Sequence, residues 1–254
     1  MPRCVELANQ ESTRTIGKKM NFALILAGGV GARLHAGIPK QFVLVDEKPI
    51  IVYTLEAFQN HPNIDAIVIV SLSDYIDEVW HLVATYKLTK VSQVVAGGET
   101  GHLSTQNGIF SLKGYAKADD IIIIHDAIRP IVPQPIIDDL LKVCQEYGNA
   151  VSSLPMQETV ILTDDQRSGI ESLDRKYVRR VQTPQAYKFV DLINVYEQAF
   201  ARGITNSVYC NTLFIELGYR LYFSRGFANN VKITTSDDIA LFKALKKFSE
   251  EDLI

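Results

Sequence analysis

Four consecutive isoleucines, Ile121–Ile124, constrain the fold of this 254-residue chain more than any other feature. A β-branched run without polar alternation suits a strand buried on both faces. Similar short apolar runs lie at 22–26, 66–70 and 91–95, and helical patterns lie between them at 50–60, 76–86, 105–112 and 136–147. Strands that alternate with helices in this way predict an α/β fold, a mainly parallel, doubly wound, Rossmann-like sheet with helices on both faces.

The pattern changes over residues 150–187, where short β-type pieces are separated by polar turns. These pieces lie at 150–154, 159–162 and 177–182. Because no helical period of ten residues occurs between them, we predict an inserted antiparallel arm. Beyond the arm, the patterns predict helices at 190–202, 211–217 and 237–248, and a strand at 220–224.

Charge and terminal composition limit the classes of function. The chain has 26 basic and 29 acidic residues and a net charge of −3, which argues against a general nucleic-acid binder. Residues 1–19 are polar and lack the apolar stretch of a secretory signal, so we expect a leader or disordered tail there and a single domain over 20–254. No apolar run reaches the length of a membrane span.

The three cysteines, Cys4, Cys144 and Cys210, have no metal-ligand spacing. An odd number of cysteines also fits poorly with a disulfide framework. We therefore expect free thiols and a cytoplasmic protein.

The first strand runs into a glycine loop, Leu26-Ala27-Gly28-Gly29-Val30-Gly31-Ala32-Arg33-Leu34. Glycines allow a sharp turn and let backbone N–H groups approach a phosphate. The dinucleotide fingerprint needs Gly or Ala where Leu34 stands, and the NTPase phosphate loop needs Ser or Thr where Gln41 follows Lys40. Neither of those two sites fits, and the loop by itself is equally consistent with a tight turn between strand and helix.

Two cations, Arg33 and Lys40, follow the glycines. Attack on the α-phosphorus of a nucleoside triphosphate builds negative charge on the phosphate oxygens, which nearby cations stabilise. The string Gly28-Gly29-x-Gly31-x-Arg33-x₅-Pro39-Lys40-Gln41-Phe42 resembles the signature of nucleotidyltransferases that join a nucleoside triphosphate to a phosphorylated sugar or polyol.

Four further motifs follow in order: Gly97-Gly98-Glu99 with Ser104, Ile124-His125-Asp126-Ala127-Ile128-Arg129-Pro130, Asp174-Arg175 with Thr183-Pro184-Gln185, and Asn230-x-Lys232-Ile233-Thr234-Thr235. Over residues 21–247 the set resembles the cytidylyltransferases for methylerythritol 4-phosphate and ribitol 5-phosphate. The resemblance implies a nucleotidyltransferase sheet and a Mg²⁺-dependent transfer of CMP from CTP to a polyol phosphate, giving a CDP-polyol and pyrophosphate.

The resemblance also implies roles for single residues. Nucleotide-binding positions are Leu26, Ala27, Gly28, Gly29, Gly31, Gly97, Gly98, Ser104 and Asp126, of which Asp126 is also the metal position. Arg33 and Lys40 match the cations that stabilise the transition state, and Arg175 and Lys232 match the cations that position the acceptor phosphate. Acceptor-binding positions are Arg129, Thr159 and Thr183. In the family a neighbouring subunit completes the acceptor site, so we expect a homodimer formed through the 150–187 arm.

Two positions depart from the family pattern. Gly101 stands where the family commonly has Arg, beside His102, and Val208-Tyr209-Cys210 replaces a usual Thr-Asp-Glu/Ala sequence. An acceptor contact at the second position is therefore not implied, although Ser207 or Thr212 could provide one. We expect His125 to be structural, since an ionised phosphate nucleophile needs no general base.

The motifs divide between the two acceptors, and their balance favours ribitol 5-phosphate. Two alternatives stay open at this point: a nucleotidyltransferase for another sugar phosphate, and a non-catalytic nucleotide-binding protein.

Overall fold

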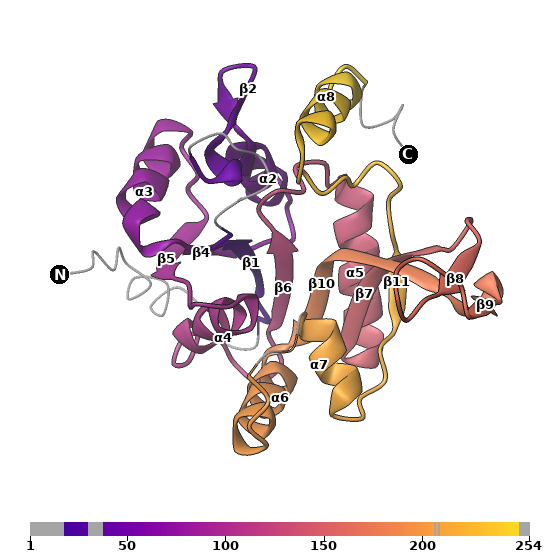
Figure 1. Cartoon of the computed structure of the whole chain (residues 1–254). Coiled ribbons are helices and arrows are strands. Elements are labelled where there is room, and N and C mark those ends of the chain that lie inside the picture. Colours follow the sequence, from indigo (N-terminus) through magenta and orange to yellow (C-terminus); the bar gives the residue numbers. More distant parts are fainter. Residues whose placement is uncertain (1–17, 30–37, 206, 208, 249–254) are drawn as a thin grey trace.

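The computed structural model describes residues 18–29, 38–205, 207 and 209–248. At its centre lies a seven-stranded sheet with the strand order β11-β7-β10-β6-β1-β4-β5 (Figure 1). Its strands are β1 (Asn21–Ala27), β4 (Ala66–Ser71), β5 (Val91–Ala96), β6 (Ile121–Asp126), β7 (Asn149–Pro155), β10 (Arg179–Lys188) and β11 (Phe223–Arg225). The chain's first and last thirds both contribute strands, so the sheet joins the whole molecule.

The half of the sheet formed by β6, β1, β4 and β5 is wholly parallel. The four isoleucines of β6 are at most 3% exposed, as a strand covered on both faces requires. Leu26 is aligned with both Val70 and Asp126 in the register, so the carboxyl ends of β1, β4 and β6 meet at one edge. Ligands bind at this edge in open α/β sheets.

Helices cover both faces, which confirms the predicted doubly wound α/β architecture. One face carries α2 (Ile50–Gln59), α3 (Ile76–Thr85) and α5 (Gln134–Tyr147), and the other carries α4 (Gly101–Ser111), α6 (Phe189–Ala201) and α7 (Cys210–Glu216). Alternate residues of β1 point to opposite cores: Ala23 and Ile25 pack with α2, whereas Phe22 and Leu24 pack with α4 and α6.

A third, smaller core holds the last helix, α8 (Ser236–Leu245), against the body. Phe242 of α8 packs with Ile50, Ile128 and Ile233. Thr235 caps α8, and its side chain accepts a hydrogen bond from the Asp238 amide. Because Ile128 lies between Asp126 and Arg129, and Ile233 follows Lys232, this core fixes the ends of two candidate site segments.

Three further short elements complete the N-terminal part: a 3₁₀ turn η1 (Lys40–Phe42), the hairpin of β2 (Leu44–Val45) and β3 (Lys48–Pro49), and a second 3₁₀ turn η2 (Ser73–Tyr75). Helix α4 begins at Gly101, four residues before the predicted start, because Thr100 caps it by accepting a hydrogen bond from the Leu103 amide. No helix in the described part of the chain is both long and apolar enough to cross a membrane.

The predicted arm is shorter than its expected bounds of 150–187. Strands β7 and β10 belong to the central sheet, where β10 runs antiparallel to both β6 and β7. Ala186 and Tyr187 of β10 are fully buried, so this stretch builds the core rather than an excursion. The sequence predicted a β-type piece only at 177–182, because polar residues such as Gln182 and Gln185 interrupt the apolar pattern. Both side chains are hydrogen-bonded inside the protein.

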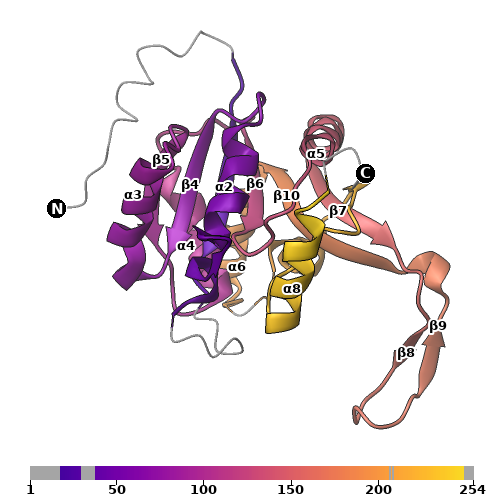
Figure 2. The same ribbon diagram turned by 90° about the horizontal axis from the view of Figure 1, so that it is seen from above.

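What leaves the body is the segment between β7 and β10. It contains a two-stranded hairpin of β8 (Val160–Leu162) and β9 (Glu171–Leu173), followed by the 3₁₀ turn η3 (Arg175–Tyr177). Figure 2 shows this hairpin projecting well away from the sheet and its helices. The arm therefore comprises residues 156–178.

Candidate active site

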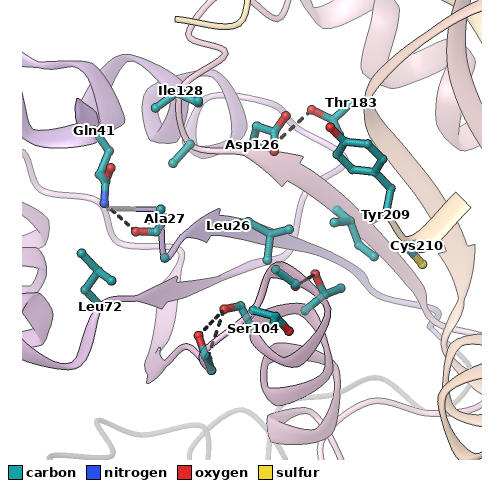
Figure 3. A pocket seen from close by; sticks show the side chains of 18 of the residues that line it. Leu26, Ala27, Gln41, Leu72, Ser104, Asp126, Ile128, Thr183, Tyr209 and Cys210 are labelled. Atoms are coloured by element: carbon teal, nitrogen blue, oxygen red, sulfur yellow. Dashed lines mark hydrogen bonds between the residues drawn. The ribbon is translucent and has the colours of Figure 1, made fainter. Parts of the chain in front are cut away.

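A cavity of about 540 Å³ opens at the edge where β1, β4 and β6 end. Its walls come from the segments after β1 and β5, from η1, from the first turn of α4, and from β10, α7 and the segment before α8. The size and position suit a nucleotide together with a small second substrate. Figure 3 shows this cavity, which we divide into a glycine side (Ala27, Gly28, Gly98, Ser104) and a cationic side (Asp126, Thr183, Lys232).

The glycine side is built from close backbone packing around Ser104. The Ser104 hydroxyl accepts a hydrogen bond from the Gly98 amide at 3.1 Å and lies 3.2 Å from the Gly98 carbonyl. A Cβ at Gly97 would come within 2.9 Å of that hydroxyl, and one at Gly28 within 3.3 Å. A side chain at Gly97 would therefore force Ser104 to shift, and one at Gly28 would be tightly packed against it.

Gln41 and Phe42 fix the segment that carries Lys40. The buried Gln41 side chain donates a 2.6 Å hydrogen bond to the carbonyl of Ala27, and Phe42 stacks on Tyr75 with ring centroids 4.9 Å apart. This anchoring holds η1 beside the end of β1 and brings Lys40 to the cavity wall. The motif that contains Gln41 implied no role for it, and the hydrogen bond of its buried amide to Ala27 explains why glutamine stands at this position.

The cationic side is an ion cluster around Asp126. The Asp126 Oδ2 atom lies 3.1 Å from Arg129 Nε and 3.0 Å from Lys232 Nζ. Burial by itself would raise the pKa of Asp126, but the charges of Lys232 and Arg129 outweigh it, and the pKa lies below its usual value. Asp126 is therefore ionised at neutral pH, and the cluster carries a net charge of about +1.

Strand β10 holds the cationic side in place. The Thr183 hydroxyl accepts a hydrogen bond from the Asp126 amide at 3.2 Å (Figure 3). The Thr183 carbonyl accepts one from the Asn230 side chain at 2.7 Å. Arg129 donates to the Asn230 carbonyl at 2.8 Å. Segments near residues 126, 183 and 230 thus meet only in the fold, which brings Lys232 next to Asp126.

His125 is structural, as its sequence context suggested. It is fully buried, its ring lies 5.2 Å from that of Phe58, and its Nε2 lies 3.0 Å from the Arg129 carbonyl. Burial lowers the pKa of His125 to about 4, so the ring is neutral and its Nε2–H donates to that carbonyl. His125 thereby orients Arg129.

The family arginine missing at Gly101 is not replaced by its neighbour. His102 is buried, and its ring packs 5.1 Å from that of Tyr196. Burial lowers the pKa of His102 as well. The side chain is directed into the core between α4 and α6, and Gly101 itself lines the cavity without a side chain.

Most predicted site residues that the structure describes lie at the cavity. Those lining it are Leu26, Ala27, Gly28, Gly29, Lys40, Gly98, Ser104, Asp126, Thr183 and Lys232. Gly97 supports Ser104 from behind, and Arg129 contributes through Asp126. Gly31 and Arg33 lie outside the described residues.

Two predicted residues lie elsewhere. Thr159 and Arg175 are exposed on the arm, where Arg175 donates a 2.7 Å hydrogen bond to the Gln157 carbonyl. Neither lines the cavity of its own chain. Leu72 and Tyr209 also line the cavity. No motif marked Leu72, and the sequence placed Tyr209 only in a segment that departs from the family pattern, without a role. Ser207 and Thr212 bond to each other and to the Tyr209 backbone instead of lining the cavity.

Comparisons with known proteins agree with this geometry. The family model described as 2-C-methyl-D-erythritol 4-phosphate cytidylyltransferase matches residues 21–247. A ribitol-5-phosphate cytidylyltransferase of Lacticaseibacillus paracasei is 44% identical over 230 residues, covering 90% of this chain and 98% of its own. A 2-C-methyl-D-erythritol 4-phosphate cytidylyltransferase of Clostridium botulinum is 33% identical over 222 residues, covering 87% of this chain and 95% of its own.

The fold is similar to a solved structure as well. The crystal structure of 4-diphosphocytidyl-2C-methyl-D-erythritol synthase from Anaerococcus prevotii superposes with a TM-score of 0.77 at 23% identity, over 91% of this chain and 99% of that one. This likeness extends the agreement to the arrangement of sheet and helices. The chain belongs to the 2-C-methyl-D-erythritol 4-phosphate cytidylyltransferase family.

Proposed function

We propose that the protein transfers CMP from CTP to ribitol 5-phosphate, releasing pyrophosphate and forming CDP-ribitol. The relatives named ribitol-5-phosphate cytidylyltransferase are up to 44% identical to this chain, against 33–34% for those named for methylerythritol 4-phosphate. The observation that carries the proposal is that one cavity joins a glycine side, where backbone would contact a nucleotide, to a cationic side, whose positive charge would bind a second phosphate.

The reaction is an in-line displacement at phosphorus. An oxygen of the acceptor phosphate forms a bond to the α-phosphorus of CTP, and the bond from that phosphorus to the bridging oxygen of pyrophosphate breaks. The attacking oxygen is already ionised at pH 7, so no side chain has to remove a proton. This chemistry agrees with the absence of a titrating role for the buried, neutral His125.

The chain's own residues act by position and charge. Lys40 is held on the glycine side by the Gln41 anchor, where a cation stabilises the charge that develops on the triphosphate. Lys232 and Arg129 carry the positive charge of the cationic side, where an acceptor phosphate would exchange for part of their contact with Asp126. The α-phosphorus of bound CTP would lie between the two sides of the cavity.

The cavity fits Mg²⁺ in the way that nucleotide sites usually hold it. Among the described residues no group of three or more His, Cys, Asp or Glu side chains could hold a metal by itself. Mg²⁺, however, needs only one or two carboxylates when substrate phosphates and waters supply the other ligands. Asp126 would hold the ion with the triphosphate, and the ion would neutralise phosphate charge when bound.

The arm supports a homodimer as part of the proposal. It has no core of its own, and it exposes apolar side chains, among them Tyr177 at 81% and Ile170 at 63% exposed. A lone two-stranded hairpin is marginal in water and gains stability from a partner surface. Packing between two copies across a two-fold axis would cover these side chains and would deliver Arg175 and Thr159 to the cavity of the other subunit.

A cytoplasmic location is proposed on the state of the thiols. Cys144 and Cys210 are free and buried, and burial raises the pKa of each thiol to about 12. Such thiols are inert packing groups, which is usual for proteins of a reducing compartment.

Pyrophosphate release tests the function directly. Each of CTP, UTP, ATP and GTP would be combined with ribitol 5-phosphate and with 2-C-methyl-D-erythritol 4-phosphate, with and without Mg²⁺. We expect turnover only with CTP and Mg²⁺ and a higher kcat/KM for ribitol 5-phosphate. Comparable turnover with UTP would remove the cytidylyl assignment, and a preference for the methyl-branched acceptor would reassign the substrate within the family.

A further inference from the structure

Tyr209 lies in one of the two segments where the chain departs from the family motif, and it lines the cavity at its cationic side. It immediately precedes α7 and lines the cavity, yet its side chain is 53% exposed. In Figure 3 its ring stands over the cavity with the hydroxyl end directed toward Asp126 and Thr183. A large aromatic side chain that stays half-exposed inside a concave site is available to a ligand.

The backbone beneath this ring is fixed. The Tyr209 amide donates to the Thr212 hydroxyl at 3.1 Å, and that hydroxyl donates to the Tyr209 carbonyl at 2.7 Å. Directly after it, Cys210 is 6% exposed and Phe214 packs 4.5 Å from the Tyr187 ring. Helix α7 is thus anchored in the core, so the ring of Tyr209 projects from a rigid base.

The charges near Tyr209 define which part of a substrate it meets. Lys232 Nζ lies 5.8 Å from the ring centroid and 3.0 Å from Asp126 Oδ2. If the acceptor phosphate binds Lys232, the rest of the acceptor extends along the wall that Tyr209 forms. That part of a polyol phosphate consists of hydroxyl groups on a short hydrocarbon chain, which a phenol matches with one polar atom and an apolar face.

We propose that Tyr209 determines acceptor specificity: its hydroxyl forms a hydrogen bond with a hydroxyl of the polyol chain, and its ring narrows the cavity against a methyl branch. This inference rests on the proposed function and deepens it. An unbranched chain such as that of ribitol 5-phosphate keeps its hydroxyls along the wall, whereas the methyl group of 2-C-methyl-D-erythritol 4-phosphate would meet the ring.

Two variants separate the hydroxyl from the ring. Tyr209→Phe removes only the hydrogen bond, so the KM for ribitol 5-phosphate is expected to rise about 3- to 10-fold while the KM for CTP stays within about twofold. Tyr209→Ala also removes the wall, so the preference for ribitol 5-phosphate over the methyl-branched acceptor is expected to fall by about tenfold. Tyr147→Phe is the matched control, because Tyr147 is similarly exposed at 48% but stacks on Tyr222 away from the cavity.

The outcomes distinguish this inference from the proposed function. If the unsubstituted protein releases no pyrophosphate from CTP with ribitol 5-phosphate, the proposed function fails and this inference fails with it. If the unsubstituted protein is active and both variants keep its acceptor KM and preference, only the inference is overturned. An equal rise in the KM for CTP would also overturn it, since Tyr209 would then act on the nucleotide. Thermal unfolding of each variant verifies that α7 is intact.

Discussion

The two halves of the central sheet supply the cavity in different ways. In the parallel half, the segments after β1 and β5 contribute backbone and small residues, glycines pack against Ser104, and β6 contributes Asp126. In the other half, β10 and the segments that it holds contribute long charged or aromatic side chains, Lys232 and Tyr209. In the proposed reaction, backbone groups would bind the nucleotide and side chains would bind the acceptor. Amino-acid substitutions alter side chains and leave backbone groups in place, so the acceptor contacts are the easier ones to change.

This difference explains why the acceptor is harder to infer than the nucleotide. The glycine side depends on steric limits, since a Cβ at Gly97 or Gly98 would come within 2.9 Å or 2.4 Å of neighbouring atoms. The cationic side imposes no such limit on Tyr209, which is half-exposed. Substitutions in the two halves are therefore expected to have different effects, and four measurements test that contrast.

The largest effect is expected from Lys40 on the glycine side. Lys40→Ala should lower kcat about 10²- to 10³-fold, the loss typical of removing one preorganised electrostatic contact to a transition state. Steady-state pyrophosphate release gives the rate, and Lys48→Ala is the matched control, because Lys48 pairs with Glu56 and does not line the cavity. Retention of more than about half the rate would show that the glycine side binds the nucleotide without catalytic help from Lys40.

The next effect tests whether the arm belongs to a neighbouring cavity. If the proposed homodimer forms, the Lys40→Ala and Arg175→Ala proteins, each nearly inactive, should regain roughly a quarter of the unsubstituted activity after subunit exchange. Half of the dimers would then be mixed, and each mixed dimer would keep one intact site. Exchange is followed with subunits carrying different tags. No recovery despite exchange would mean that Arg175 acts within its own chain or outside the reaction.

Much of the parallel half could be predicted from the sequence. A run such as Ile121–Ile124 indicates a strand buried on both faces, and this strand is buried in the structure. The glycine motif after β1 indicates the edge of the sheet where a ligand binds, and its first two glycines line the cavity. Lys40, Ser104 and Asp126 therefore lie where their motifs suggested.

The other half could not be predicted in the same way, because its strand β10 carries buried polar residues. Gln182 is 6% exposed and forms two hydrogen bonds with the backbone of Phe227, a partner 45 positions away. No local pattern reveals such a bond, so the residues from 179 to 187 resembled an exposed arm. Tyr209 received no role from the sequence for a related reason, because its place in the cavity depends on how α7 docks on the core.

A third measurement concerns His125. It lies in β6, the strand of the parallel half that pairs with β10. The pKa of His125 is about 4 in the folded protein and about 6.5 in the unfolded chain. As the pH falls, the unfolded chain therefore binds a proton at a higher pH than the folded protein does. Stability from this group is complete above pH 6.5 and is lost as the pH falls toward 4. Between pH 7 and pH 5 the loss is about 2 kcal/mol.

His125→Gln should remove that part of the pH dependence, because glutamine does not titrate. Urea unfolding of both proteins at pH 7 and pH 5 gives the two differences, and any loss common to both pH values cancels. His61 and His102, whose pKa values burial also lowers, are present in both proteins and do not affect the comparison. An unchanged pH dependence in the variant would show that His125 becomes protonated in the folded state.

The smallest effect concerns how tightly the parallel half is packed, and α4 provides a matched pair of glycines. A Cβ at Gly108 would come within 2.6 Å of both Leu24 and Val70, which are fully buried, whereas one at Gly101 would meet nothing within 4 Å. Gly108→Ala should lower the free energy of unfolding by about 1 kcal/mol, since overpacking outweighs the gain in helix propensity. Gly101→Ala should leave it unchanged or raise it slightly. Equal shifts in urea unfolding would mean that the backbone of α4 can move away from β1 and β4, and the contrast between a rigid glycine side and an adaptable cationic side would then lose its structural basis.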